Sequence, residues 1–136
     1  MSAMLTAEQR VTLKKAAYGA ITLLSLSGFG GRAAKKEFSA GTVTLVGANG
    51  LVGAILSGGS EKFTITGNSA DAIADEVLDG LSSTIAVLSD QDPNEAANFR
   101  NTVTIALSQA AAASGGPTPG QSAVIDKMRT ALGETI

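Results

Sequence analysis

The chain has 136 residues, of which 16% are charged, and it contains neither cysteine nor histidine. Disulfides and metal sites built on thiolates or imidazoles are therefore excluded, and catalysis would have to use carboxylates, lysines, hydroxyls or the single tyrosine. The formal net charge is −2, with more basic than acidic residues in 1–62 and the reverse in 63–136. This imbalance is far weaker than a nucleic-acid-binding patch, so we expect no nucleic-acid partner.

A first helix is predicted to begin at Thr6, which forms a T-x-x-Q capping box with Gln9. Small and branched apolar residues then recur at helical spacing on one face: Leu13, Ala17, Ala20 and Leu24. The glycine-rich segment 27–31 ends this helix, and a charged segment restarts at 32–37. Aromatic residues are scarce, so the core must consist mainly of Ala, Leu, Val and Ile, whose small side chains allow helices to approach closely.

Residues 38–60 carry no charge, and their pattern suits two different structures. Alternating Val and Thr, together with the pair Asn49-Gly50, favour a β-hairpin around 42–56. The apolar mass of the segment also favours a buried, glycine-weakened helix or two short helices. We expect residues 62–66 to be extended.

Three amphipathic helices are predicted in the rest of the chain, because each apolar face follows a polar cap. The first begins at Asn68 or Ser69, the second at Asp92-Pro93 and the third at Thr118-Pro119. Their short loops imply antiparallel packing. We therefore predict one all-α domain over residues 1–136, an irregular bundle of about five helices. An α+β fold with a hairpin around 42–56 is the alternative.

Two segments have features of membrane targeting. A basic cluster precedes the uncharged stretch Ala16 to Gly31, which resembles a signal peptide, although Glu8 and the capping box favour a folded helix. The uncharged stretch 38–60 is long enough to span a bilayer, but its six glycines weaken insertion. We expect a cytoplasmic protein with no membrane partner.

A glycine motif lies within the uncharged stretch, at Gly47, Gly50 and Gly53. It resembles the G-x-x-G-x-x-G turn of short-chain dehydrogenases, in which the chain leaves a strand, passes a pyrophosphate and enters a helix. Too few residues follow Gly53 for a normal crossover helix, and no further parallel strands are predicted. The three glycines are weak cofactor-binding candidates, and we expect no cofactor.

An acidic row, Asp71, Asp75 and Asp79, falls on one face of a predicted helix, opposite the apolar face. Carboxylate oxygens suit Mg²⁺ or Ca²⁺, so these residues are weak candidates for metal ligands. A solvated helix face with acidic residues near its N-terminus explains the same pattern. The acidic residues between 90 and 95 are interpreted as helix caps.

Two segments, Ala110 to Gly133 (AAAASGGPTPGQSAVIDKMRTALG) and Tyr18 to Phe38, resemble the helical hairpins of the TerB-like (tellurite-resistance-associated) domain. In that family an aspartate in the turn is followed, several residues later, by a glutamate that leads into an amphipathic helix. The resemblance implies a related helical fold.

The acidic positions of that family are missing from this chain. In the second hairpin the turn aspartate falls at Ser114 or Gly115 and the glutamate at Gln121. In the first hairpin Ser27 stands at the aspartate position, and the nearest acid, Glu37, lies too far along the chain. The resemblance therefore carries the fold to this chain and not the metal binding.

The best-supported function from the sequence is a non-catalytic helical module for protein interaction or self-association, with a homodimer as the expected assembly. The alternative is a nucleotide-ligand-binding protein that uses the Gly47-Gly50-Gly53 turn. The conformation of residues 42–56 separates the two, because the alternative requires a strand, a turn and a helix in that order.

Overall fold

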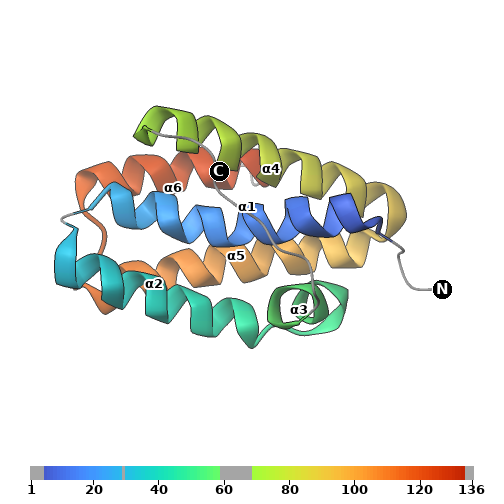
Figure 1. The fold of residues 1–136 in the computed structure, drawn as a ribbon, viewed down its shortest axis with the longest axis horizontal. Helices are drawn as coiled ribbons and strands as arrows, with labels where there is room; N and C mark the ends of the chain where they lie inside the picture. Colours follow the sequence, from blue (N-terminus) through green and yellow to red (C-terminus); the bar gives the residue numbers. More distant parts are fainter. Residues whose placement is uncertain (1–4, 29, 59–68, 134–136) are drawn as a thin grey trace.

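The computed structural model describes residues 5–28, 30–58 and 69–133, and in these ranges the chain forms six α-helices and no strand (Figure 1). The helices are α1 (Ala7–Leu26), α2 (Gly31–Val46), α3 (Gly50–Ser57), α4 (Ala70–Gln91), α5 (Pro93–Ala113) and α6 (Pro119–Ala131). The predicted all-α bundle is confirmed, with six helices in place of about five.

The predicted caps begin four of these helices. Thr6 and Gln9 form a reciprocal capping box at α1, and Thr118 and Gln121 form the same device at α6. Ser69 accepts a hydrogen bond from the backbone N–H of Ala72 at the start of α4, and Asp92 accepts one from Asn94 at the start of α5. Polar side chains in the sequence therefore located these helix starts correctly.

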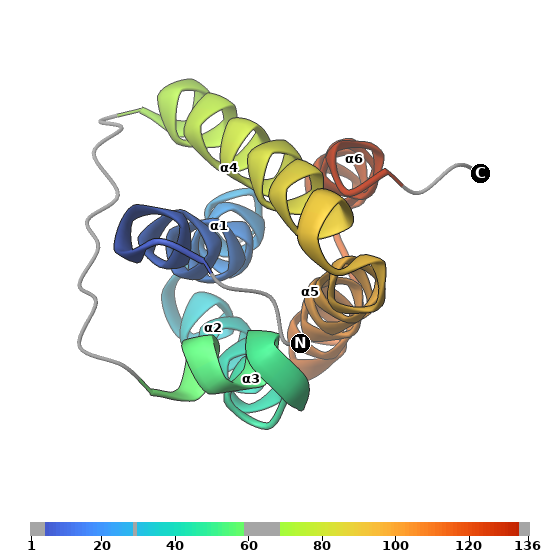
Figure 2. The same ribbon diagram turned by 90° about the vertical axis from the view of Figure 1, so that its right-hand side faces the viewer.

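Helix α1 lies at the centre of the bundle (Figure 2). It packs against α4 on one side and against α2 on the other, and α5 contacts both α2 and α4. Helix α6 covers one side of α4 and α5, while the short α3 lies across the ends of α2 and α5 (Figure 2). Within the described residues α2 and α4 make no contact, so their outer faces lie on opposite sides of α1.

Small residues set the spacing between α1 and its neighbours. A Cβ atom at Gly41 of α2 would lie 2.6 Å from Cδ1 of Ile21, and one at Gly80 of α4 would lie 3.2 Å from Cβ of Ala16. The predicted apolar face of α1 is fully buried, at Leu13, Ala17, Ala20 and Leu24. The bundle is thus held by close contact between helices, with Phe99 of α5 as a fully buried aromatic residue.

The alternative hairpin around 42–56 is wrong, because this region contains the end of α2 and all but the last residue of α3. The buried residues of α2 are Glu37, Gly41 and Leu45, which are four apart and share one helical face. Val43 and Val46 project outward from the same helix. Because these exposed positions are apolar, the sequence alternates between Val and Thr there and resembles a strand. The extended segment predicted at 62–66 lies outside the described residues.

No helix among the described residues has both the length and the apolar character needed to cross a bilayer. The uncharged stretch is divided between α2 and α3, which end at Val46 and Ser57.

Candidate functional site

The outward-facing side of α2 combines exposed apolar and basic side chains. It is formed by Arg32, Lys35, Lys36, Ser39, Val43 and Val46, and is called the α2 outer face below. Val43 is 73% exposed, the highest value among the exposed large hydrophobic residues of the described chain. Of the five such residues, Phe38, Val43 and Val46 lie on α2, and Leu26 lies at the adjoining end of α1.

Charge is distributed unevenly along the α2 outer face. The three basic residues occupy its N-terminal half, and the two valines occupy its C-terminal half. The one acidic residue of α2, Glu37, is 1% exposed and points into the bundle. The surface therefore presents positive charge next to apolar area, with no acidic side chain of its own helix to neutralise it.

A groove of about 690 Å³ continues this surface between the end of α1 and the start of α2. Leu26 and Phe38 line it, together with Lys35 from the α2 outer face and the buried Ser25. Exposed apolar area of this kind is uncommon on the surface of a monomer and tends to mark an interface.

The N-terminal half of α2 is held in place by a buried polar cluster around Glu37, which was not predicted from the sequence. Oε2 of Glu37 accepts hydrogen bonds from Nε2 of Gln121 at 2.7 Å and from Oγ of Ser114 at 2.6 Å. Nε2 of Gln121 also donates to the carbonyl oxygen of Leu24 at 3.1 Å. Glu37 and Gln121 are both buried, so this cluster joins α2, the end of α5 and the start of α6 inside the bundle.

The cluster brings together the two turns that were compared with the TerB-like domain. The hydroxyl of Thr118 donates to the carbonyl oxygen of Ser27 at 3.3 Å, so the turn after α1 adjoins the turn after α5. A Cβ atom at Gly28 would lie 2.3 Å from Nε2 of Gln121, which explains the glycine at this point. Glu37 had been placed too far along the chain to take part, but helix α2 returns it to this junction.

The three candidate glycines form a connection between two helices rather than a strand–turn–helix. Gly47 caps α2, Gly50 begins α3 with φ of +70°, and Gly53 is buried within α3. The residues expected to form the preceding strand belong to α2. The strand required by a dehydrogenase-like phosphate turn is therefore replaced by a helix.

The side-chain carboxylate of Glu95, from α5, lies at the N-terminus of α3. Oε1 of Glu95 accepts a hydrogen bond from the backbone N–H of Val52 at 3.1 Å. Nδ2 of Asn98 donates to the carbonyl oxygen of Asn49 at 2.8 Å and to Oε1 of Glu95 at 3.3 Å. Glu95 had been interpreted as a cap of its own helix, and it also caps α3 at the position that a bound anion would take.

Two further polar residues of α1 fasten the other end of α3. The hydroxyl of Tyr18 donates to the carbonyl oxygen of Leu56, and Nζ of Lys14 donates to that of Gly58, both at 2.9 Å. Burial raises the pKa of Tyr18 above its ordinary value of 10.0. Both side chains bind the last carbonyl groups of a helix, where hydrogen-bond donors are needed.

The acidic row is solvent-exposed. Asp71, Asp75 and Asp79 all lie on the outer side of α4, and the neighbouring Glu76 forms an ion pair with Lys15 of α1. Among the described residues no group of three or more carboxylate, thiol or imidazole side chains is placed to hold a metal ion. The row makes the exposed side of α4 acidic.

Comparison of the chain with protein-family models, with curated proteins and with solved structures gives no match.

Proposed function

We propose that the chain is a non-catalytic helical module that binds a second copy of itself through the α2 outer face. The observation that carries this proposal is the concentration of exposed apolar residues: four of the five large ones among the described residues lie on α2 or beside it. A second copy would cover these side chains, and a twofold dimer is the commonest closed assembly.

The charge pattern of α2 favours an antiparallel arrangement of the two helices. With a twofold axis near Ser39, the basic half of one α2 lies opposite the apolar half of the other. Arg32 then approaches the partner's helix C-terminus, whose last turn contains no basic residue and whose carbonyl groups attract cations. The aliphatic stems of the lysines add contact with the valines.

The polar residues of the fold also support a non-catalytic role. Glu37, Glu95, Lys14 and Tyr18 each hold the bundle together through hydrogen bonds. The full sequence lacks histidine and cysteine, the commonest catalytic bases and thiol nucleophiles. The alternative of nucleotide binding at the glycine turn would have to displace Glu95 from the N–H groups of α3.

Sedimentation equilibrium at micromolar concentration tests the proposal. The wild-type chain should have twice its monomer mass of 13.6 kDa. Val43→Lys places a positive charge opposite the partner's Lys35 and should restore the monomer mass, because like charges repel. Ala86→Lys, at an exposed position of α4, is the matched control and should remain dimeric.

A wild-type chain that remains monomeric at every concentration would overturn the proposal, as would a dimer that Val43→Lys leaves intact. If the wild-type chain is monomeric, the α2 outer face would be a candidate binding surface for a different protein, one that presents acidic and apolar residues on a single helix.

A further inference from the structure

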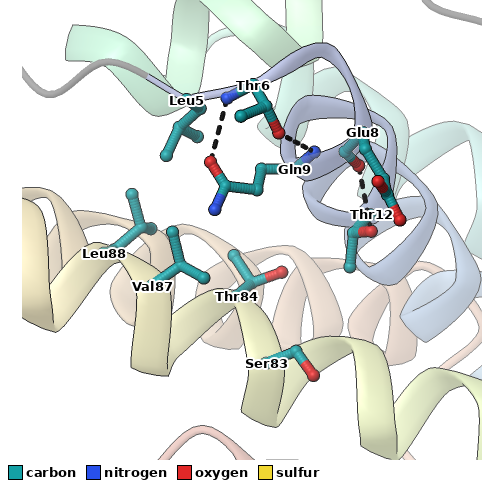
Figure 3. Close-up of a pocket in the computed structure, with 9 residues that line it drawn as sticks. All are labelled: Leu5, Thr6, Glu8, Gln9, Thr12, Ser83, Thr84, Val87 and Leu88. Carbon is teal, nitrogen blue, oxygen red and sulfur yellow. Dashed lines mark hydrogen bonds between the residues drawn. The ribbon is translucent and has the colours of Figure 1, made fainter.

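A separate pocket lies at the other end of α1, where the first turns of that helix face α4 (Figure 3). Its volume is about 420 Å³, which is within the range of sites that bind small molecules. It shares no lining residue with the α2 outer face or with the α1–α2 groove. A ligand bound here would leave the proposed dimer interface free.

One side of the pocket is apolar. Leu5 precedes α1 and is 8% exposed, and Leu88 of α4 is fully buried beneath it. Val87, one residue earlier on α4, is half-buried and packs against the core. These three side chains provide a surface for the hydrocarbon part of a ligand.

The α4 side of the pocket also contains a hydroxyl group that lacks a hydrogen bond, one turn before Val87 and Leu88. Thr84 of α4 is 5% exposed, and its Oγ1 has no hydrogen-bond partner in the described part of the chain. Several other helical threonines of this protein donate to the carbonyl four residues earlier, as Thr12 and Thr130 do, whereas Thr42 resembles Thr84 in having no such partner among the described residues. Because leaving a buried hydroxyl unsatisfied is unfavourable, Thr84 is suited to bind a group that enters the pocket.

Gln9 supplies a second polar group in a fixed orientation. Its Oε1 accepts a hydrogen bond from the backbone N–H of Thr6 at 2.9 Å, as part of the capping box. The side-chain nitrogen is therefore turned away from Thr6 and toward α4, as Figure 3 shows. Its two N–H groups are donors for an oxygen acceptor, and the hydroxyl of Thr84, which Figure 3 shows on the side of the pocket facing Thr12, is a separate polar group.

The charge around the pocket selects among acceptors. Among the described residues no basic side chain lines it, and the one ionisable lining residue is the exposed carboxylate of Glu8. An anionic ligand would be repelled without compensation, whereas a neutral carbonyl oxygen accepts hydrogen bonds at no such cost. We infer that this pocket binds a small uncharged carbonyl compound, such as an amide, with the carbonyl accepting from Gln9, its other polar atom near Thr84 and its apolar body on Leu5, Val87 and Leu88.

Titration of the ¹⁵N-labelled protein with benzamide, followed by NMR, tests this inference. Backbone resonances of Gln9, Thr84 and Val87 should shift together, with a dissociation constant on the order of 1–10 mM for so small a ligand. Benzoate has the same shape with a negative charge, and it should bind more weakly. The absence of these shifts with benzamide, or shifts that map elsewhere, would overturn the inference.

Two variants test the assigned donors. Thr84→Val preserves shape without the hydroxyl and should weaken benzamide binding roughly 3–10-fold, while Thr130→Val on α6 is the matched control and should have no effect. Gln9→Glu keeps the capping box and removes both N–H donors, so it should also weaken binding. Benzamide binding that is unchanged in both pocket variants would contradict the assignment.

Discussion

At the scale of single residues, several polar side chains of this protein link helices through hydrogen bonds. The link made by Tyr18 is the simplest to measure. Tyr18 is the one tyrosine of a chain that has no tryptophan, so the tyrosinate absorbance band reports on this residue alone. Burial raises its pKa, and its hydroxyl donates to Leu56. An alkaline titration should therefore show ionisation above the ordinary value of 10.0.

The same shift predicts how stability depends on pH. The folded state holds the phenol proton more tightly than the unfolded state, so this contribution is complete below pH 10.0 and is lost as pH rises through the folded pKa. Tyr18→Phe should reduce the alkaline loss of unfolding free energy measured by urea denaturation. A tyrosinate midpoint at or below 10.0 would show that the hydroxyl is not held as described.

Gln121 is the residue whose replacement should cost most in the polar cluster. Gln121→Leu removes the amide that donates to Glu37 and to the carbonyl oxygen of Leu24, leaving the buried carboxyl group with Ser114. We expect the unfolding free energy to fall by about 3 kcal/mol in urea denaturation, as for other buried polar pairs that lose one partner.

A double variant provides the control for this cluster. Glu37→Leu combined with Gln121→Leu removes both polar groups, so it should be more stable than Gln121→Leu alone. If the double variant is the less stable of the two, the cost of Gln121→Leu does not arise from an unsatisfied Glu37.

At the scale of elements, the turn between α2 and α3 depends on one glycine. Gly50 has φ of +70°, and a Cβ atom there would lie 2.7 Å from Oε2 of Glu95. Gly50→Ala should therefore lower the unfolding free energy by about 1–3 kcal/mol. Gly47, with φ of −83°, is the matched control, and Gly47→Ala should change stability by less than about 0.5 kcal/mol.

Thermal or urea unfolding of the two variants checks this prediction. Equal losses at the two positions would mean that the left-handed backbone of Gly50 is not the constraint. The comparison also separates two glycines that the sequence motif placed in the same role.

The helices were predictable from sequence where polar caps and a buried apolar face coincide. Thr6, Ser69, Asp92 and Thr118 begin α1, α4, α5 and α6 as expected. Helix α2 was ambiguous because its N-cap, Gly30, makes no side-chain hydrogen bond and the C-terminal half of its outer side carries valines in place of charges. An exposed apolar face removes the contrast from which helical periodicity is recognised.

At the scale of the whole molecule, the sequence did not reveal which distant residues meet. Glu37 and Gln121 are 84 positions apart, and Val52 and Glu95 are 43 apart, so local pattern carries no information about either contact. The pocket between α1 and α4 likewise arises from tertiary packing and was not predicted. The division into a basic half and an acidic half was visible in the sequence, and the fold places α2 of the basic half and α4 of the acidic half on opposite sides of α1 (Figure 2).

The proposed contact between two α2 outer faces is tested most directly by cysteine cross-linking, because the natural chain has no cysteine. Ser39→Cys places one thiol at the middle of the α2 outer face, and Ser89→Cys places one at an exposed position of α4. A bis-maleimide about 10 Å long matches the separation of packed helices. We predict rapid formation of a cross-linked dimer from the Ser39 variant and little from the Ser89 variant. Equal rates from the two positions, or no dimer from the Ser39 variant, would contradict the account.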